Sequence, residues 1–268
     1  MRKIFLPLML MIFVLTGCGG EKEDSKNISS VKHSKILVIG VDDKFAPMGF
    51  RDEQGNIVGF DIDLAKEAAK RLGVEVEFRS IDWDRKREEL LSGNIDIIWN
   101  GLDIIDGYKE YMIFSKPYME NRQILLVKKG NPKNIQSLGD LEGKIVGTQV
   151  GSNSETYVLE DDALKNSFAE FKTCHDIGEG FAALNNGEFD AMIVDEIAAR
   201  YEINKKPGTF EIVEARVGPM TEFGIGFRQK DTELRDKVQK VFNEMVKDGT
   251  AAKISEEWFQ ADLIVSKR

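Results

Sequence analysis

The sequence contains little histidine, cysteine or proline. Among its 268 residues there are 2 His, 2 Cys and 6 Pro. The histidines are His33 and His175, and no Cys-x-x-Cys or Gly-x-Ser-x-Gly pattern occurs. Metal clusters and nucleophile–base pairs need such residues in defined patterns. We therefore expect no metal, no cofactor and no enzymatic activity.

Basic charge is also in short supply. The chain has 37 Lys and Arg against 46 Asp and Glu, a formal net charge of -9. A nucleic-acid-binding protein needs a basic surface that displaces counterions from phosphates, so this class is excluded. Hydrophobic residues make up 42% and charged residues 31%, which is enough for a buried core and a solvated surface. At roughly 100 to 200 residues per domain, the length fits one large domain or two modest ones.

The first 34 residues read as targeting sequence. A basic start is followed by an apolar run over residues 4–15, interrupted only by Pro7 and too short to span a bilayer. This pattern predicts a signal peptide over residues 1–17. The following Leu-Thr-Gly-Cys resembles a bacterial lipobox, which implies that Cys18 is acylated; an ordinary signal with an incidental cysteine is the alternative. Residues 18–34 are polar and predict a flexible, lipid-anchored tether.

The body begins with one α/β unit. Residues 35–41 (KILVIGV) are typical of a strand buried on both faces. A turn at Gly55-Asn56 precedes a helix predicted over 61–72, which Gly73 is placed to end. A strand at 74–79, a helix at 84–91 and a strand at 95–99 follow. This order predicts a parallel sheet with helices on both faces.

A second unit of the same kind follows. Its expected elements are a strand at 144–148, helices at 155–164 and 179–185, and a strand at 191–194. Extended apolar segments on either side are interpreted as crossings between two lobes, and the tail predicts two helices, the second around Trp258. We predict an α/β protein of two Rossmann-like lobes with a ligand cleft between them. The expected lobes are residues 35–123 plus 224–268, and 124–223, with hinge crossings near 123–128 and 219–226.

Six short motifs occur in order between residues 35 and 259. They are GFDIDLA at 59–65, LLSGNID at 90–96, FSKPY at 114–118, DLEGK at 140–144, GEFDA at 187–191, and DGT at 248–250 leading to Trp258-Phe259. Together they resemble the extracytoplasmic solute-binding proteins of ABC importers, in the amino-acid-binding family 3, with the type II periplasmic-binding-protein fold. The resemblance implies a small-molecule ligand, an ABC permease and ATPase as partners, and a monomer.

The resemblance also implies a set of cleft residues. The candidate ligand-binding residues are Asp42, Phe45, Trp83, Asn100, Gly101, Asp103, Tyr108, Gly151, Ser152, Asn153 and Asp195. At a helix start, Ser152 and Asn153 would favour an anionic group, and Asp195 is suited to an ammonium group. Phe45 and Trp83 would sandwich an aliphatic chain or face a cation, or they could simply pack in the core.

One departure from the family pattern bears on the ligand. In amino-acid binders of this family a small hydroxyl residue and a Thr-x-x-Arg motif follow the strand, and the arginine grips the ligand's α-carboxylate. Here Asp103 replaces the hydroxyl residue, Ile105 the threonine and Tyr108 the arginine. Asp103 would repel a ligand carboxylate.

Three interpretations follow from this departure. The pocket is retuned for a cationic ligand without an α-carboxylate, which Asp103, Asp195 and the aromatic residues would suit. Alternatively, Lys109, Arg122 or Arg51 replaces the arginine and the ligand is an ordinary amino acid. In the third interpretation the pocket has lost its ligand.

Other classes carry less support in the sequence. A dehydratase-like enzyme would use Asp103 as a general acid. A ligand sensor would continue into a membrane helix, whereas ten residues follow Trp258. We predict a lipoprotein on the outer face of the cell membrane that captures a small amino-acid-like or amine ligand by lobe closure.

Overall fold

The computed structural model describes residues 36–265. The predicted signal peptide (1–17), the tether (18–34) and the acylated Cys18 lie outside the described residues. The expectations about targeting and anchoring are therefore not tested by the fold.

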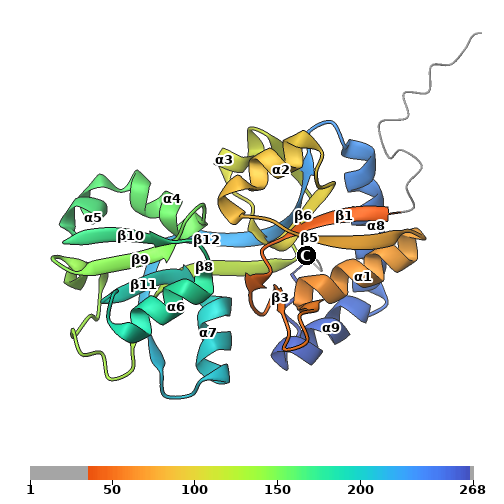
Figure 1. The fold of residues 1–268 in the computed structure, drawn as a ribbon. Helices are drawn as coiled ribbons and strands as arrows, with labels where there is room; N and C mark the ends of the chain where they lie inside the picture. The colour runs from red at the N-terminus through yellow and green to blue at the C-terminus, as the bar shows by residue number, and fades with distance from the viewer. Residues whose placement is uncertain (1–35, 266–268) are drawn as a thin grey trace, which may run out of the picture. The chain divides into compact units, whose positions relative to one another are not determined.

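A mixed sheet runs through the described part of the chain (Figure 1). At one end β1 (Ile36–Val41) pairs in parallel with β5 (Glu75–Ser80) and β6 (Ile97–Asp103). At the other end β9 (Ile145–Gln149) pairs in parallel with β10 (Glu170–Cys174) and β11 (Ala191–Asp195). The strand order is β10-β9-β11-β8-β12-β6-β1-β5.

Two long antiparallel strands join these parallel groups. They are β8 (Met119–Lys128) and β12 (Phe210–Arg228), which pair with each other along most of their length. β12 also pairs with β6 and with β7 (Met112–Phe114), and β8 pairs with β11. The chain thus crosses between the two parallel groups twice, in agreement with the two predicted crossings.

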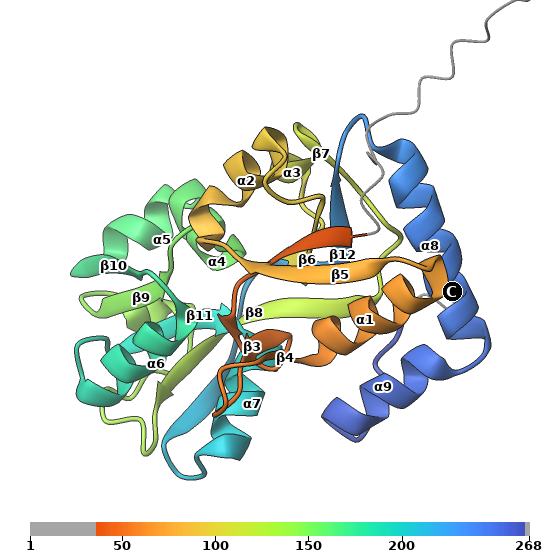
Figure 2. The same cartoon turned by 45° about the vertical axis from the view of Figure 1, so that its right-hand side comes forward.

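Helices cover both groups of strands. The first lobe has α1 (Phe60–Leu72), α2 (Lys86–Ser92), α3 (Asp106–Lys109), α8 (Thr232–Lys247) and α9 (Thr250–Phe259). Figure 2 shows α1, α8 and α9 packed together. The second lobe has α4 (Asn153–Glu160), α5 (Asp162–Ser167), α6 (Ile177–Asn186) and α7 (Glu196–Lys205). We use first lobe for β1–β7 with α1–α3, α8 and α9, and second lobe for β9–β11 with α4–α7.

Shorter elements complete the described chain. The first lobe carries a small sheet of β2 (Lys44–Phe45), β3 (Gly49–Arg51) and β4 (Ile57–Val58), in which the predicted Gly55-Asn56 turn joins β3 to β4. Two 3-10 helices, η1 (Trp83–Arg85) and η2 (Leu138–Leu141), precede α2 and β9.

Local chemistry explains where the main elements begin and end. Helix α1 ends where predicted, because Gly73 adopts a left-handed conformation with φ 70° and donates its N–H to the carbonyls of Ala69 and Lys70. Every residue of β6 is buried, as expected for a central strand with helices on both faces. These features fix the carboxyl ends of the strands, where the candidate site residues lie.

Two of the predicted helices are divided differently in the structure. The helix expected over 155–164 is broken, because the Asp161 carboxylate accepts the N–H of Leu164 and caps a separate helix, α5. The helix expected over 84–91 begins as the 3-10 helix η1 and continues as α2.

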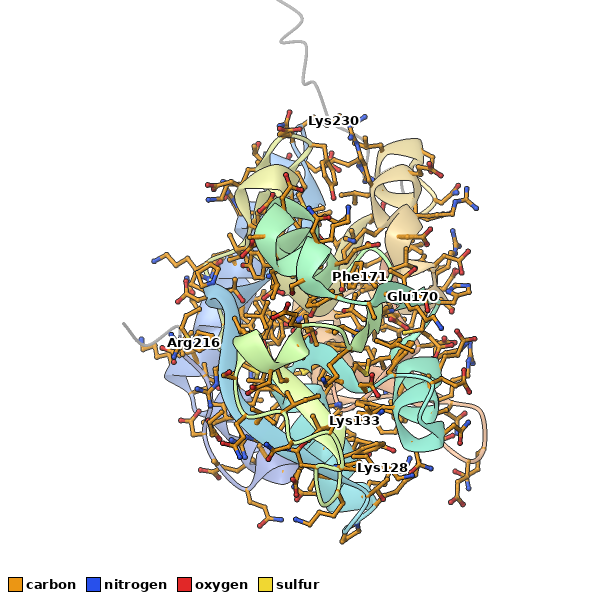
Figure 3. All side chains as sticks on the ribbon, turned by 90° about the vertical axis from the view of Figure 1, so that its left-hand side faces the viewer. Lys128, Lys133, Glu170, Phe171, Arg216 and Lys230 are labelled. Atoms are coloured by element: carbon orange, nitrogen blue, oxygen red, sulfur yellow. The ribbon has the colours of Figure 1, made fainter. Side chains whose placement is uncertain are left out.

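The elements that were not predicted include β2, β7, η2, β10 and α7. Strand β10 forms the edge of the sheet with no buried residue, so its sequence lacks the apolar run of a central strand. Figure 3 shows Glu170 and Phe171 on this edge. The Glu170–Lys172 ion pair at 3.1 Å gives the strand charged side chains, which discourage pairing with another chain.

Gly101 offers a test of close packing in β6. It has φ 55°, and an added Cβ would lie 2.5 Å from Cε1 of Phe45. Gly93 has a similar positive φ of 83°, but no atom lies within 4 Å of its added Cβ. We expect Gly93→Ala to cost about 1–2 kcal/mol of unfolding free energy from backbone strain. Gly101→Ala should cost about 1–3 kcal/mol more because Phe45 must move. Urea denaturation would measure both, and equal losses would contradict the packing argument.

Candidate functional site

The candidate site residues come from strand ends and helix starts in both lobes. Asp42 follows β1, and Asp103 is the last residue of β6. In the second lobe Ser152 caps α4 and Asp195 ends β11. One cavity is lined by Asp42, Phe45, Trp83, Asn100, Gly101, Leu102, Asp103, Tyr108, Gln149, Ser152, Asn153 and Asp195.

The structure thus brings together all but one of the predicted residues. The exception, Gly151, lies beside the cavity, and its carbonyl accepts hydrogen bonds from Tyr108 and Lys86. Leu102 and Gln149 line the cavity without having been predicted. Leu102 lies between the predicted Gly101 and Asp103, and Gln149 ends β9, so both lie at strand ends like several of the predicted residues.

Asn121, on the crossing strand β8, joins a carboxylate from each lobe. Its Nδ2 donates to Oδ1 of Asp103 at 3.0 Å and also to Oδ1 of Asp195. Thr221 Oγ1 donates to Asp103 at 2.6 Å, and Gln123 Nε2 donates to Asp195 at 2.7 Å. Each acid therefore receives neutral donors, but neither has an ion-pair partner within the described residues.

Burial makes ionisation of these acids costly. Burial, reinforced by the charge of Asp195, raises the pKa of Asp103 to about 7. Burial also raises the pKa of Asp195 above its ordinary value. A positive charge bound between the two carboxylates would lower both pKa values and offset this cost.

A third carboxylate links the lobes on another side of the cavity. Asp42 Oδ2 accepts a hydrogen bond of 2.7 Å from Gln149 Nε2 of the second lobe. Burial is the main cause that raises the pKa of Asp42. Nearby, Lys44 of the first lobe pairs with Asp176 of the second at 2.6 Å. The cavity is thus bordered by contacts that require both lobes.

A buried lysine that the sequence analysis did not identify stands beside the cavity. Lys86, the first residue of α2, is 4% exposed. Its Nζ donates to the carbonyls of Trp83 at 3.1 Å and Gly151 at 2.7 Å. Burial lowers the pKa of Lys86 to about 8. Its sequence context, WDRKREEL, resembles a solvated helix face, so composition gave no signal for this position.

The predicted substitutes for the missing arginine lie elsewhere. Lys109 pairs with Asp106 at 2.9 Å, Arg122 pairs with Glu196, and Arg51 pairs with Asp43. None of these three basic residues lines the cavity. The prediction that one of them enters the site is therefore wrong for this conformation, because each already has a carboxylate partner.

Several amide atoms at the site have no hydrogen-bond partner in the described residues. Both polar side-chain atoms of Asn100 and Oδ1 of Asn153 are buried and unsatisfied. Buried polar groups are nearly always paired in folded proteins, because an unpaired one costs about 1–3 kcal/mol. Both residues line the cavity, so these atoms mark it as a place where polar ligand groups would be stabilised.

The cavity is small in this conformation. Its volume is about 20 Å³, which is room for roughly one water molecule. Small-molecule sites commonly measure about 300–1,000 Å³. A ligand can therefore enter only if the lobes separate or the lining side chains move.

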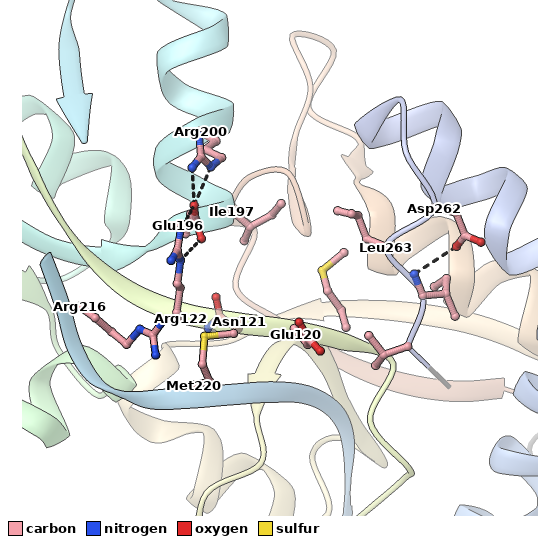
Figure 4. Close-up of a pocket in the computed structure, with 13 residues that line it drawn as sticks. Glu120, Asn121, Arg122, Glu196, Ile197, Arg200, Arg216, Met220, Asp262 and Leu263 are labelled. Carbon is pink, nitrogen blue, oxygen red and sulfur yellow. Dashed lines mark hydrogen bonds and ion pairs between the residues drawn. The ribbon is translucent and has the colours of Figure 1, made fainter. Parts of the chain in front are cut away.

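A larger groove of about 700 Å³ lies elsewhere on β8 (Figure 4). Here Arg122 and Arg200 both contact the Glu196 carboxylate, and the walls come from β8, α7, β12 and residues 262–265. Of the residues that line the small cavity or donate hydrogen bonds to its carboxylates, Asn121 alone also lines this groove. By volume the groove would be the better candidate for a binding site. The buried amide atoms without hydrogen-bond partners favour the smaller cavity instead.

Within residues 36–265, no group of three or more His, Cys, Asp or Glu residues is placed to hold a metal ion. Among the described helices, none is long and apolar enough to cross a membrane.

Sequence comparison identifies the family. Residues 37–261 match the family of bacterial extracellular solute-binding proteins, family 3. The chain is 32% identical over 262 residues to the L-cystine-binding protein TcyJ of Escherichia coli K12, covering 98% of this chain and 97% of that protein. It is 33% identical over 268 residues to the arginine-binding extracellular protein ArtP of Bacillus subtilis, covering 98% and 100%. The chain therefore belongs to solute-binding protein family 3.

Solved structures agree with this assignment. An ABC uptake transporter substrate-binding protein from Streptococcus pneumoniae with bound histidine has a TM-score of 0.82 and 34% identity, covering 87% of this chain and 95% of that one. An ancestral arginine-binding protein bound to arginine has a TM-score of 0.78 and 41% identity, covering 84% and 98%. The predicted fold, two α/β lobes of the type II periplasmic-binding-protein kind, is confirmed.

The raised pKa of Asp103 gives a pH-dependent stability. In the folded protein the carboxyl titrates near pH 7, against an ordinary value of 3.8. Below pH 4 the group is protonated in both folded and unfolded states; as the pH rises from 4 to 7 the folded state loses stability. Asp103→Asn removes this loss, so without ligand its stability advantage over the natural chain should grow by a few kcal/mol across that range.

Urea denaturation at pH 4, 5.5 and 7 would measure the difference. Glu53→Gln, at an exposed position, is the control and should show a nearly constant difference from the natural chain. A difference for Asp103→Asn that does not change with pH would show that folding does not raise the pKa of Asp103.

Proposed function

We propose that this protein is the solute-binding component of an ABC importer, and that it binds a small ligand of the amino-acid class carrying a positive charge. Relatives of similar length are named as binding proteins for cystine, arginine and histidine, which supports a ligand with an amino group. Their names also support binding without chemical conversion. An ABC permease and its ATPase would receive the ligand.

The proposal of a cationic ligand rests on the Asn121 side-chain amide, which donates to both Asp103 and Asp195. Two carboxylates, Asp103 buried and Asp195 half-buried, contact the same Asn121 side chain, and neither pairs with a Lys or Arg within residues 36–265. An ammonium or guanidinium group placed there would contact both lobes. The aromatic rings of Phe45, Trp83 and Tyr108 line the same cavity and would add cation–π attraction.

Closure of two lobes is the proposed mechanism of capture. The moving bodies would be residues 35–123 plus 224–268, and 124–223, turning about the crossings near 123–128 and 219–226. A ligand that contacts both lobes favours the closed state by its extra contacts there. Gln149 to Asp42 and Lys44 to Asp176 are contacts that would form only on closure.

Two ligand chemistries satisfy this description. A cationic amine without an α-carboxylate is favoured by Tyr108 at the expected arginine position and by the negative charge of Asp103. A cationic amino acid is favoured by the arginine and histidine for which a relative and two structural neighbours are named. Both would place their positive group against Asp103 and Asp195.

Ligand binding should depend strongly on Asp195. Asp195→Asn keeps an oxygen to accept from Asn121 and Gln123 but removes the charge, so the dissociation constant of a bound cation should rise about 10- to 100-fold. A thermal-shift screen of arginine, lysine, histidine, cystine and the matching amines would find the ligand. A ligand at 100 times its dissociation constant stabilises the folded protein by about 2.7 kcal/mol. Calorimetry would then compare the variants.

Asp106→Asn is the matched control for this charge change. The Asp106 side chain is 97% exposed and pairs only with Lys109 among the described residues, so its loss should leave affinity unchanged. Absence of any shift with every compound in the natural chain would refute the proposed ligand class. Equal losses in both variants would refute the placement of the cation.

We also propose anchoring through Cys18 at the outer face of the cell membrane. The lipobox-like Leu-Thr-Gly-Cys before the polar segment 18–34 supports this location. Cys18→Ser should therefore leave the chain out of the membrane fraction, whereas Cys174→Ser should not; fractionation with metabolic labelling by a fatty-acid analogue measures both. A Cys18→Ser chain that still takes up the label would contradict the assignment.

A further inference from the structure

Lys86 is a buried ammonium group without a carboxylate partner among the described residues. It is 4% exposed, and both acceptors of its Nζ are neutral backbone carbonyls, of Trp83 and Gly151. An ammonium group carries three N–H donors, so one is left. Burying a charge without an ion pair costs several kcal/mol, which a partner of opposite charge would offset.

The position of this ammonium ties it to the candidate ligand cavity. Its Nζ lies 4.9 Å from the ring centroid of Trp83 and 4.9 Å from that of Tyr108. Both rings line the cavity. The charge therefore stands in the wall of the site, held between two aromatic side chains that a ligand would contact.

Helix α4 brings further donors to the same place. The carbonyl that Lys86 binds belongs to Gly151, and α4 begins two residues later, with Ser152 as its cap. The first N–H groups of a helix have no acceptor within it and attract anions. Glu155 already accepts from the Gly151 N–H at 2.6 Å, but it forms no ion pair with Lys86.

Tyr108 explains why a cation at position 86 and an arginine at position 108 exclude each other. The Tyr108 ring packs on the Lys86 ammonium, so an arginine there would place two like charges together in a buried wall. A tyrosine instead offers the negative face of its ring to the ammonium and a hydroxyl that donates to Gly151.

We propose that Lys86 binds the carboxylate of the ligand in the role of the arginine that Tyr108 replaces. The ligand is then an amino acid, with its carboxylate between Lys86 and the start of α4 and its positive group against Asp103 and Asp195. The unpaired amide of Asn100 supplies a further donor in the same cavity. This inference rests on the proposed binding of a cationic ligand and narrows it to compounds with a carboxylate.

Pairs of ligands that differ only in the carboxylate test the proposal. The probes are arginine against agmatine, lysine against cadaverine, and histidine against histamine. Calorimetry on the full chain in detergent should show that the natural protein binds the amino acid of a pair at least about 10-fold tighter. Lys86→Met should weaken binding of the amino acid about 10- to 100-fold and binding of the amine less than about 3-fold. Lys86→Arg should restore most of the preference.

Lys109→Met is the matched control, since Lys109 pairs with exposed Asp106 away from the cavity and should leave the preference unchanged. Tighter binding of the amine by the natural protein would overturn the proposal without any variant, even if Lys86→Met fails to fold. Equal weakening of both members of a pair by Lys86→Met would also overturn it, since the residue would then act only on packing. Failure of the underlying cation site is distinguishable, because the natural protein would then bind neither member.

Discussion

The hydrogen bonds of Asn121 to Asp103 and Asp195 are the interaction on which the site depends. Each acid ends a strand of a different lobe, and Asn121 lies on β8, which joins the two lobes. Two buried carboxylates near one amide repel each other unless a proton or cation intervenes. The arrangement therefore couples the position of the lobes to the charge held between them, which is the property that a binding protein requires.

The fold could be predicted in its main features because strands and helices leave periodic patterns. Strand β1 is a continuous apolar run, β6 begins as one at Ile97–Trp99, and α1 shows one apolar stripe ended by Gly73. Edge strand β10 and helix α7 escaped prediction, since neither has a strongly apolar face. Their existence is decided by tertiary packing, which sequence periodicity does not report.

The site residues at strand ends could be predicted from the topology. Lys86, which follows a short 3-10 helix, could not. Asp103 and Asp195 each end a strand of one of the two parallel groups, and the carboxyl ends of parallel strands are where ligands bind. Lys86 lies beside the cavity as the first residue of α2, directly after the 3-10 helix η1. A 3-10 segment changes the angular position of every later side chain, and nothing in a charged stretch indicates that one will form.

The contacts around Gly151 show how capture and closure can be the same event. Lys86 and Tyr108 reach this carbonyl from the first lobe, while the backbone that carries it leads into α4 of the second. When the lobes part, Lys86 loses its hydrogen bond to the Gly151 carbonyl. Losing this bond is costly, because charge-assisted hydrogen bonds are stronger than neutral ones. When they close without an anion, the ammonium is buried unpaired. A closed state that includes a negative group would avoid both costs, so under the proposed role of Lys86 the charge of the ligand would favour closure.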